Sequence, residues 1–334
     1  MKVASGISLL YYRNKYQTQS EWEVVTLSPL IGVFLRLPHF INKYYMKKIF
    51  RYSPLDALLL LNLMLVGSIP YLVAYFDPPV WSWFLISIFH IWFVVNVQNT
   101  CMHHHVHCSV FVSTTANKIY ELFVSAVAGL PLEIWRYGHL LHHKHVNDKP
   151  VNGNTKDPVS VFKFSKTDEP TNFWVYCWKL TLNGDIKCSW ISSIGSILKV
   201  KEYQIRFKRQ KWAIGIYLLS IFLINPVYGL FLIPVYFLVY FVNNANSYGE
   251  HWGVLDRRGD TTQDSIGIYS TWYNIFGFGA GYHQEHHHRP GTHWTQMHTV
   301  TESLHPDRKI VKGIHILNNP FWSHFKLLFK KDTI

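Results

Sequence analysis

Two long apolar stretches constrain the fold of this chain more than any other feature. One covers residues 55–100 and is broken by Asp77–Pro79, and the other covers residues 212–243 and is broken at Asn225-Pro226. Because a bilayer core takes roughly 20 helical residues, each stretch is too long for one helix and fits two. We therefore expect four transmembrane helices in two hairpins. They are expected at residues 55–76, 80–100, 212–225 and 229–243.

The composition agrees with a membrane protein that is built from helices. Charged residues make up 16% of the chain and hydrophobic residues 49%. Soluble domains carry about 25% charged residues, so this chain is poor in charge. Aromatic residues reach 16%, and such residues are enriched at the two surfaces of a bilayer. The expected fold class is an all-α membrane protein with a cytoplasmic helical cap.

The positive charges predict which side of the membrane each segment occupies. Lys and Arg number 8 in residues 1–54, 15 in residues 101–211 and 9 in residues 246–334, which accounts for all 32 in the chain. The two expected outer turns therefore carry none. Because positive residues favour the cytoplasmic side, the termini and the central segment are predicted to be cytoplasmic. The net charge of +12 is not gathered beside a nucleic-acid-binding motif, so no nucleic acid partner is expected.

Three regions are expected along the chain. An N-terminal cytoplasmic or interfacial segment covers residues 1–54, the membrane domain covers 55–300, and a cytoplasmic tail covers 301–334. Two shorter apolar segments, residues 25–40 and 119–135, are expected to lie along the membrane surface rather than to cross it.

Clustered histidines are the features most directly related to chemistry. The chain has 20 histidines, and most gather in three runs on the predicted cytoplasmic side. Residues i, i+3 and i+4 share one face of a helix, so each run is predicted to direct its imidazoles toward one point. A further histidine, His251, stands where the fourth expected helix leaves the membrane.

Neutral imidazole is a good ligand for iron, zinc, copper and nickel. Eight or nine such ligands are too many for one tetrahedral zinc ion, and they suit two octahedral ions that each keep one position open. The predicted ligands are His103, His107, His139, His142, His143, His251, His283, His286 and His287. Only one face of each helix can point inward, so we rank the other histidines of the runs lower. These are His104, His105, His145 and His288.

At these residues the chain resembles the membrane fatty acid desaturase and hydroxylase superfamily, whose hallmark is three ordered boxes, HxxxH, HxxHH and HxxHH. Here the boxes are residues 103–107, 139–143 and 283–287. Phe111 and Pro290 agree with the residues that flank the family's first and third boxes. Residues 250–253, Glu-His-Trp-Gly, resemble an element of membrane alkane hydroxylases in which the histidine is a further iron ligand.

The resemblance implies two iron ions and oxygen as co-substrate, with attack on an unactivated C–H bond of a fatty acyl or similar lipid chain. Desaturation is the first expectation, and hydroxylation or oxidative decarboxylation are the alternatives. Because the four cysteines form no CxxC pair and no flavin motif is present, a separate electron donor is expected. It would be a protein of the ferredoxin, rubredoxin or cytochrome b5 type.

Two other classes of function compete with this one. A zinc-dependent membrane hydrolase would bind with fewer ligands, and its usual HExxH motif is missing from the chain. A metal transporter places its ligands near the middle of the bilayer, whereas the clustered histidines lie outside the expected spans.

Overall fold

The computed structural model describes residues 49–151, 154–167, 169–182, 199–252, 254, 262 and 264–304. All of them belong to one compact unit, Met46–Ile334. The apolar segment at residues 25–40 lies outside the described residues, as do most of the predicted N-terminal segment and tail. The boundaries predicted for the three regions therefore stay predictions.

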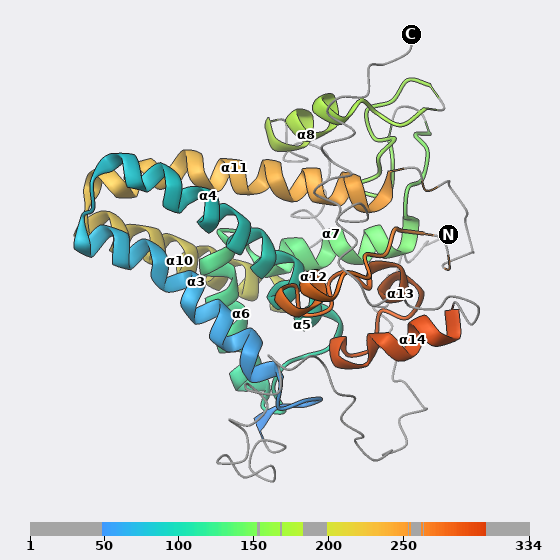
Figure 1. Ribbon diagram of the computed structural model, residues 1–334, viewed down its shortest axis with the longest axis horizontal. Helices are drawn as coiled ribbons and strands as arrows, with labels where there is room; N and C mark the ends of the chain where they lie inside the picture. The colour runs from blue at the N-terminus through green and yellow to red at the C-terminus, as the bar shows by residue number, and fades with distance from the viewer. Residues whose placement is uncertain are drawn as a thin grey trace. The chain divides into compact units, whose positions relative to one another are not determined.

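The described part of the chain is helical and contains no β-strand. Its four longest helices cover the two apolar stretches of the sequence (Figure 1). They are α3 (Asp56–Phe76), α4 (Val80–Val97), α10 (Lys201–Ile224) and α11 (Pro226–His251).

The breaks between these helices fall where the sequence predicts them. Helix α3 ends at Phe76, the cap residue Asp77 adopts a left-handed conformation, and Pro79 precedes α4. The Asn225 side chain caps α11 by accepting from Tyr228 N, while Pro226 takes the first helical position, where its missing N–H costs nothing. Asn225 Nδ2 also donates to Asp77 Oδ1 at 2.8 Å, so the two turns lie together at one end of the helices.

Three helices are long and apolar enough to cross a membrane: Asp56–Phe76, Val80–His107 and Pro226–His251. The expected span at residues 212–225 is the second half of α10, whose first half is rich in Lys and Arg. The chain is thus consistent with a multi-pass membrane protein. The arrangement of four spans in two hairpins stays a prediction.

These helices are apolar both where they face one another and where they face outward. Leu59, Leu63 and Val94 are fully buried where the helices face one another. Large apolar side chains face outward on the same helices, including Met64 (54% exposed) and Ile233 (67% exposed). Soluble proteins rarely expose contiguous apolar surface of this extent, because water disfavours it.

Shorter helices surround one end of the long ones. They are α5 (His103–His107), α6 (Thr114–Ala128), α7 (Leu132–His145), α8 (Phe173–Leu182), α12 (Thr271–Phe276), α13 (His283–His288) and α14 (Met297–Leu304). The apolar segment 119–135 is not one continuous element, because α6 ends at Gly129, whose φ of 68° favours glycine. Pro131 then precedes α7.

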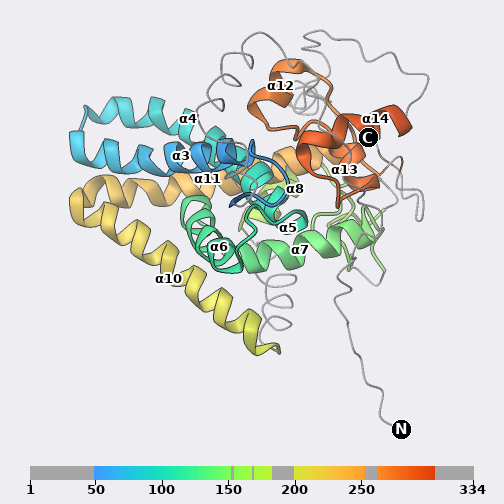
Figure 2. The same cartoon turned by 90° about the horizontal axis from the view of Figure 1, so that it is seen from below.

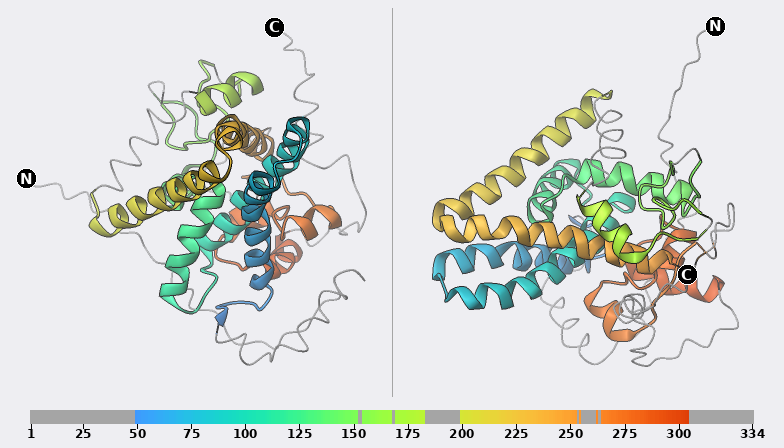
Figure 3. Two further views of the ribbon diagram at one scale, coloured as in Figure 1. Left: turned by 90° about the vertical axis from the view of Figure 1, so that its left-hand side faces the viewer. Right: turned by 90° about the horizontal axis from the view of Figure 1, so that it is seen from above.

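Helix α6 lies between α3 and α10, which diverge from each other (Figures 2 and 3). An apolar groove of about 640 Å³ follows this divergence. Its wall includes Met64 and Gly67 of α3, Phe123 of α6, and Ile216 and Tyr217 of α10. The groove is therefore lined by the candidate membrane helix α3, by α6 and by the second half of α10.

Candidate metal centre

The first histidine box extends α4 beyond the expected span. A π-helical turn, Gln98–Met102, connects α4 to α5, which carries His103 and His107. The Gln98 side chain is fully buried and donates to Ala128 O at 3.1 Å, which ties this turn to the end of α6. A π turn rotates the residues after it relative to those before it, and such turns are frequent at functional sites. Here it sets the direction of box one.

The other ligand candidates come from three further elements. Box two lies on the last turns of α7, box three forms most of α13, and His251 is the last residue of α11. Figure 1 shows α5, α7 and α13 gathered near one another, although residues 103 and 286 are 183 positions apart.

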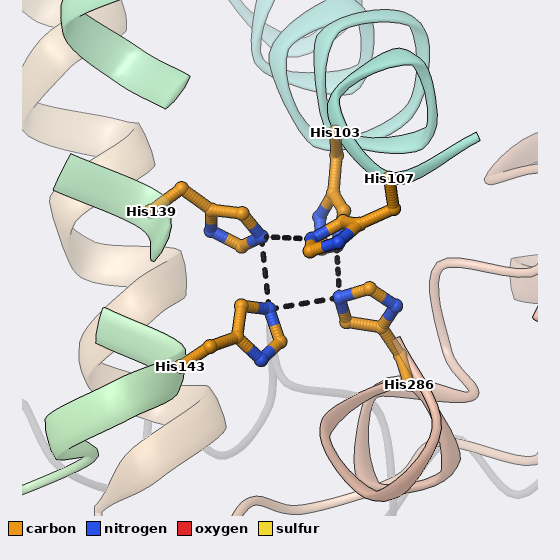
Figure 4. Close-up of side chains that lie close together, drawn as sticks. All are labelled: His103, His107, His139, His143 and His286. Carbon is orange, nitrogen blue, oxygen red and sulfur yellow. Dashed lines mark hydrogen bonds between the residues drawn. The ribbon is translucent and has the colours of Figure 1, made fainter. Parts of the chain in front are cut away.

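Five histidines form the first group, and one ring nitrogen of each lies within 4.8 Å of those of the others. They are His103, His107, His139, His143 and His286. Their Nε2 atoms make a chain of close approaches (Figure 4). The distances are 2.6 Å for His103–His286, 2.9 Å for His107–His139, 3.0 Å for His139–His143 and 3.0 Å for His143–His286.

Four histidines form the second group: His142, His251, His283 and His287. His251 Nε2 lies 3.1 Å from His142 Nε2 and 3.2 Å from His283 Nε2. All four residues are buried. The His143 and His287 rings, one from each group, have centroids only 4.4 Å apart, so the two groups are neighbours.

The structure corrects the expectation that each box is directed toward one point. His139 and His143 belong to the first group, whereas His142 belongs to the second. A helix turns about 100° per residue, so residues i and i+4 are about 40° apart while i+3 lies about 100° from i+4. Box three divides in the same way, because His283 and His287 join the second group and His286 the first. All nine predicted residues lie in the two groups.

The nitrogen arrangement fits metal ions. Imidazole nitrogens bind such ions at about 2.1 Å, so two neighbouring ligands of an octahedral ion are about 3.0 Å apart. Most of the Nε2 separations are close to that value. Both ring nitrogens of His287 are buried and have no hydrogen-bond partner among the described residues. A bound cation would satisfy one of them.

Burial keeps most of these imidazoles in the form that binds metal. It lowers the pKa of His283 to about 3, and it lowers the pKa values of His139, His143, His286 and His287 well below the ordinary value. Neighbouring imidazoles add to the lowering, since two positive charges so close repel each other. The rings are therefore neutral at pH 7, as ligation requires.

His142 differs from the others because its Nδ1 contacts a carboxylate, that of Asp157. Burial lowers its pKa, but the charge and hydrogen bond of Asp157 outweigh burial, and the net pKa is raised. Asp157 is itself fully buried and accepts from the backbone N–H groups of Asn147 and Val159. Asp148 accepts from the N–H of Asp157, so a network of carboxylates and backbone groups fixes this loop.

Two histidines of box one point away from the groups. His104 Nε2 lies 3.1 Å from Phe278 O. His105 Nε2 lies 3.4 Å from Glu121 Oε1, which also accepts from Arg136 Nη2 at 2.7 Å. Nothing in the sequence pattern pairs His105 with Glu121, because the contact depends on how α5 packs against α6.

A second contact unforeseen from the sequence joins the first long helix to the segment after box three. Asp56 is 1% exposed and accepts from His293 Nε2 at 3.0 Å and from Trp294 Nε1 at 2.8 Å. The partners are more than 230 positions apart, so no local signal predicts the pairing.

Comparison with known proteins bears on the family. The fatty acid desaturase family model matches residues 78–311, which is more than half of the chain. The chain belongs to the fatty acid desaturase family. This result confirms the resemblance carried by the histidine boxes. Membership of the family indicates a lipid-modifying oxidoreductase of the desaturase and hydroxylase type. Searches of the curated proteins and of the solved structures found no match.

Proposed function

We propose that the protein is an oxygen-dependent di-iron membrane oxidoreductase that acts on a fatty acyl or similar lipid chain, and that it is a fatty acid desaturase. One observation carries the proposal: nine imidazoles from four separate helices gather into two adjoining groups, in a chain of the desaturase family. Iron suits these ligands, and each group is large enough to hold one ion while leaving a position for oxygen.

When bound, the two irons would supply oxygen activation and removal of hydrogen from an unactivated C–H bond. The protein's own residues orient the ligands and exclude water. Asp157 holds the Nδ1 proton of His142 and so directs Nε2 into the second group. The carbonyl of Asp264 does the same for His251 at 3.0 Å.

Hydroxylation is the second candidate reaction, and one feature favours it. His251, within the element that resembles alkane hydroxylases, lies in the second group beside His142 and His283. Desaturation and hydroxylation differ in how the substrate is held over the irons rather than in the ligands. Oxidative decarboxylation to an alkene is a third outcome. The mass of the product separates the three, by loss of two hydrogens, gain of one oxygen or loss of the carboxyl carbon.

An apolar groove among the long helices supports a lipid-like substrate. The apolar groove between α3, α6 and α10 has a volume of about 640 Å³, within the range of about 300–1,000 Å³ that is usual for ligand pockets. Its apolar lining suits an aliphatic chain from the bilayer. We therefore propose that the substrate enters from the membrane.

We further propose four spans, with both termini and the metal centre on the cytoplasmic side. The contact between Asp77 and Asn225 supports this layout, because it brings the two turns that lack Lys and Arg together. Single cysteines at Asp77 and at Lys201, labelled with a membrane-impermeant reagent in oriented vesicles, should react from opposite sides. Labelling of both from the same side would contradict the layout.

The electrons would come from a separate protein of the ferredoxin, rubredoxin or cytochrome b5 type. Lys208, Arg209 and Lys211 are exposed on α10 and offer a basic surface to an acidic carrier. Reversing the charge of two of them should raise the concentration of carrier needed for half-maximal rate without changing the rate at saturation. An unchanged carrier requirement would locate docking elsewhere.

The decisive experiment measures metal and product together. We expect detergent-purified full-length protein, produced with iron supplied, to hold about two irons per chain. With oxygen, a reductant system and fatty acyl substrate, it should form a product lighter by two hydrogens. One zinc ion per chain, with no dependence on oxygen, would instead favour a zinc hydrolase.

A further inference from the structure

A carboxylate lies on the inner side of the second histidine group. Glu250, the residue before His251 at the end of α11, is 8% exposed. Its Oε2 is 3.6 Å from His283 Nε2, and that same nitrogen is 3.2 Å from His251 Nε2. Glu250 therefore approaches Nε2 of His283, the nitrogen that faces the group, rather than Nδ1 on the opposite side of the ring.

Other carboxylates near the second group are placed differently. Asp157 contacts Nδ1 of His142, the nitrogen opposite the one that faces the group. Glu285 accepts from Tyr269 and Thr301 through Oε1, and among the described residues it makes no ion pair with a histidine of the group. Among the carboxylates of the described residues, Glu250 is the one found within 4.0 Å of a nitrogen that faces the second group.

The first group has one histidine more than the second, and counting Glu250 as a ligand gives the two groups the same number of ligands. The first group has five histidines and the second has four. Four neutral imidazoles offer no charge to offset a buried dication, whereas an adjacent carboxylate does. A carboxylate oxygen 3.6 Å from one ligand nitrogen is about 0.6 Å beyond the separation of about 3.0 Å for neighbouring octahedral ligands. A small side-chain rotation brings it into that range.

We propose that Glu250 is the fifth protein ligand of the second metal ion, so that each ion has five protein ligands and one open position. This inference rests on the proposed di-iron function. Asn246 Nδ2 donates to Oε1 of Glu250 at 2.9 Å, and this bond holds one carboxylate oxygen while the other is directed to the group. The two sites then differ in net charge, because one ion is bound only by neutral imidazoles and the other by imidazoles and a carboxylate.

The test compares Glu250→Gln with wild-type protein, both full-length and loaded with ⁵⁷Fe(II) without oxygen. Mössbauer spectra should resolve two ferrous sites in the wild type. In Glu250→Gln one site should change its spectrum and lose affinity by at least about tenfold in chelator competition, while the other stays unchanged. Gln still accepts from Asn246, so a role limited to that hydrogen bond would leave both sites intact.

Three further variants separate ligation from folding. Asn246→Ala removes the hydrogen bond but keeps the carboxylate, and it should retain both irons. Glu133→Gln changes a carboxylate that is 3% exposed and lies on α7 away from the ligand nitrogens, and it should leave both spectra unchanged. If Glu250→Gln does not fold, Glu250→Asp keeps the charge with a shorter reach and should alter only the second site.

The outcomes for the inference and for the proposed function are distinct. A wild-type protein that does not hold two irons overturns the proposed function. A wild type with two irons, together with Glu250→Gln of identical affinity and spectrum, overturns the role of Glu250 and leaves the proposed function standing.

Discussion

Asp157 accepts the Nδ1 proton of His142 with both carboxylate oxygens, each 3.0 Å away. The carboxylate thereby fixes which nitrogen of the ring carries the proton and leaves Nε2 free to face His251. Because Asp157 is fully buried and bound by backbone N–H groups, the ring cannot easily rotate. The second metal site is thus oriented by a residue that lies outside it.

Replacing Asp157 by Asn should weaken metal binding at the second group by about 10–100-fold, because the amide cannot orient the ring in the same way. Retention of iron in competition with a chelator measures the loss. Asp264→Asn is the control, since the contact of Asp264 with His251 is made by its backbone carbonyl. Equal iron retention by Asp157→Asn and wild type would contradict the orienting role.

The adjacent residues His286 and His287 should have separable effects on metal content, because they lie in different groups. Each alanine variant should hold about one iron per chain, and the iron that remains should differ spectroscopically between the two variants. His288→Ala is the matched control from the same run and should keep two irons, since His288 lies in neither group. Loss of both irons in each single variant would mean that the groups bind only as one unit.

The sequence predicts which histidines meet but not how they divide. Spacing along a helix is local information, and it places His139, His142 and His143 near one face. Helical spacing also rotates His142 by about 100° from His143, but whether one site or two receive these side chains depends on the angles at which α5, α7 and α13 approach, which are set by distant packing. The π turn before box one adds a rotation that the spacing pattern does not reveal.

The ends of the long helices depend on local sequence and were therefore predictable. The buried polar pairs depend on contacts between distant residues and were not. Asp77–Pro79 and Asn225-Pro226 end or begin helices through their own backbone preferences, so the breaks are readable from the chain. The partners of Asp56 lie more than 230 positions away and become neighbours only through the fold. Such contacts have no periodic signature.

Glu121→Gln should destabilise the protein in a way that depends on pH. Burial raises the pKa of Glu121, but its hydrogen bond with His105 and the charge of Arg136 outweigh burial and lower the pKa from 4.5 to about 2. The carboxylate therefore contributes stability above pH 4.5, and this contribution is lost as the pH falls toward 2. At pH 7 the loss should be on the order of 3 kcal/mol.

Denaturant unfolding in detergent between pH 3 and pH 7 measures this difference. The gap between wild type and Glu121→Gln should be constant from pH 7 to about pH 5 and should narrow below pH 4.5. Glu202→Gln, which changes an exposed ion pair with Arg206, should have little effect at any pH. A gap of the same size at pH 3 would refute the charge-based explanation.

Asp56→Asn should destabilise the protein without removing its metal. Asp56 is buried and accepts from Trp294 through Oδ1 and from His293 through both oxygens, and in Asn one of these oxygens becomes an NH2 group that cannot accept. Losing one hydrogen bond to a charged group costs about 1.5–3 kcal/mol, which corresponds to a fall of roughly 3–10 °C in the thermal midpoint.

Asp77→Asn is the control, because its contact with Asn225 is exposed and its left-handed backbone conformation suits Asn. Thermal unfolding together with the iron content of the folded fraction separates the two effects. We expect two irons per chain in both variants and a lower midpoint only for Asp56→Asn, so loss of iron with an unchanged midpoint would assign Asp56 to the metal centre instead.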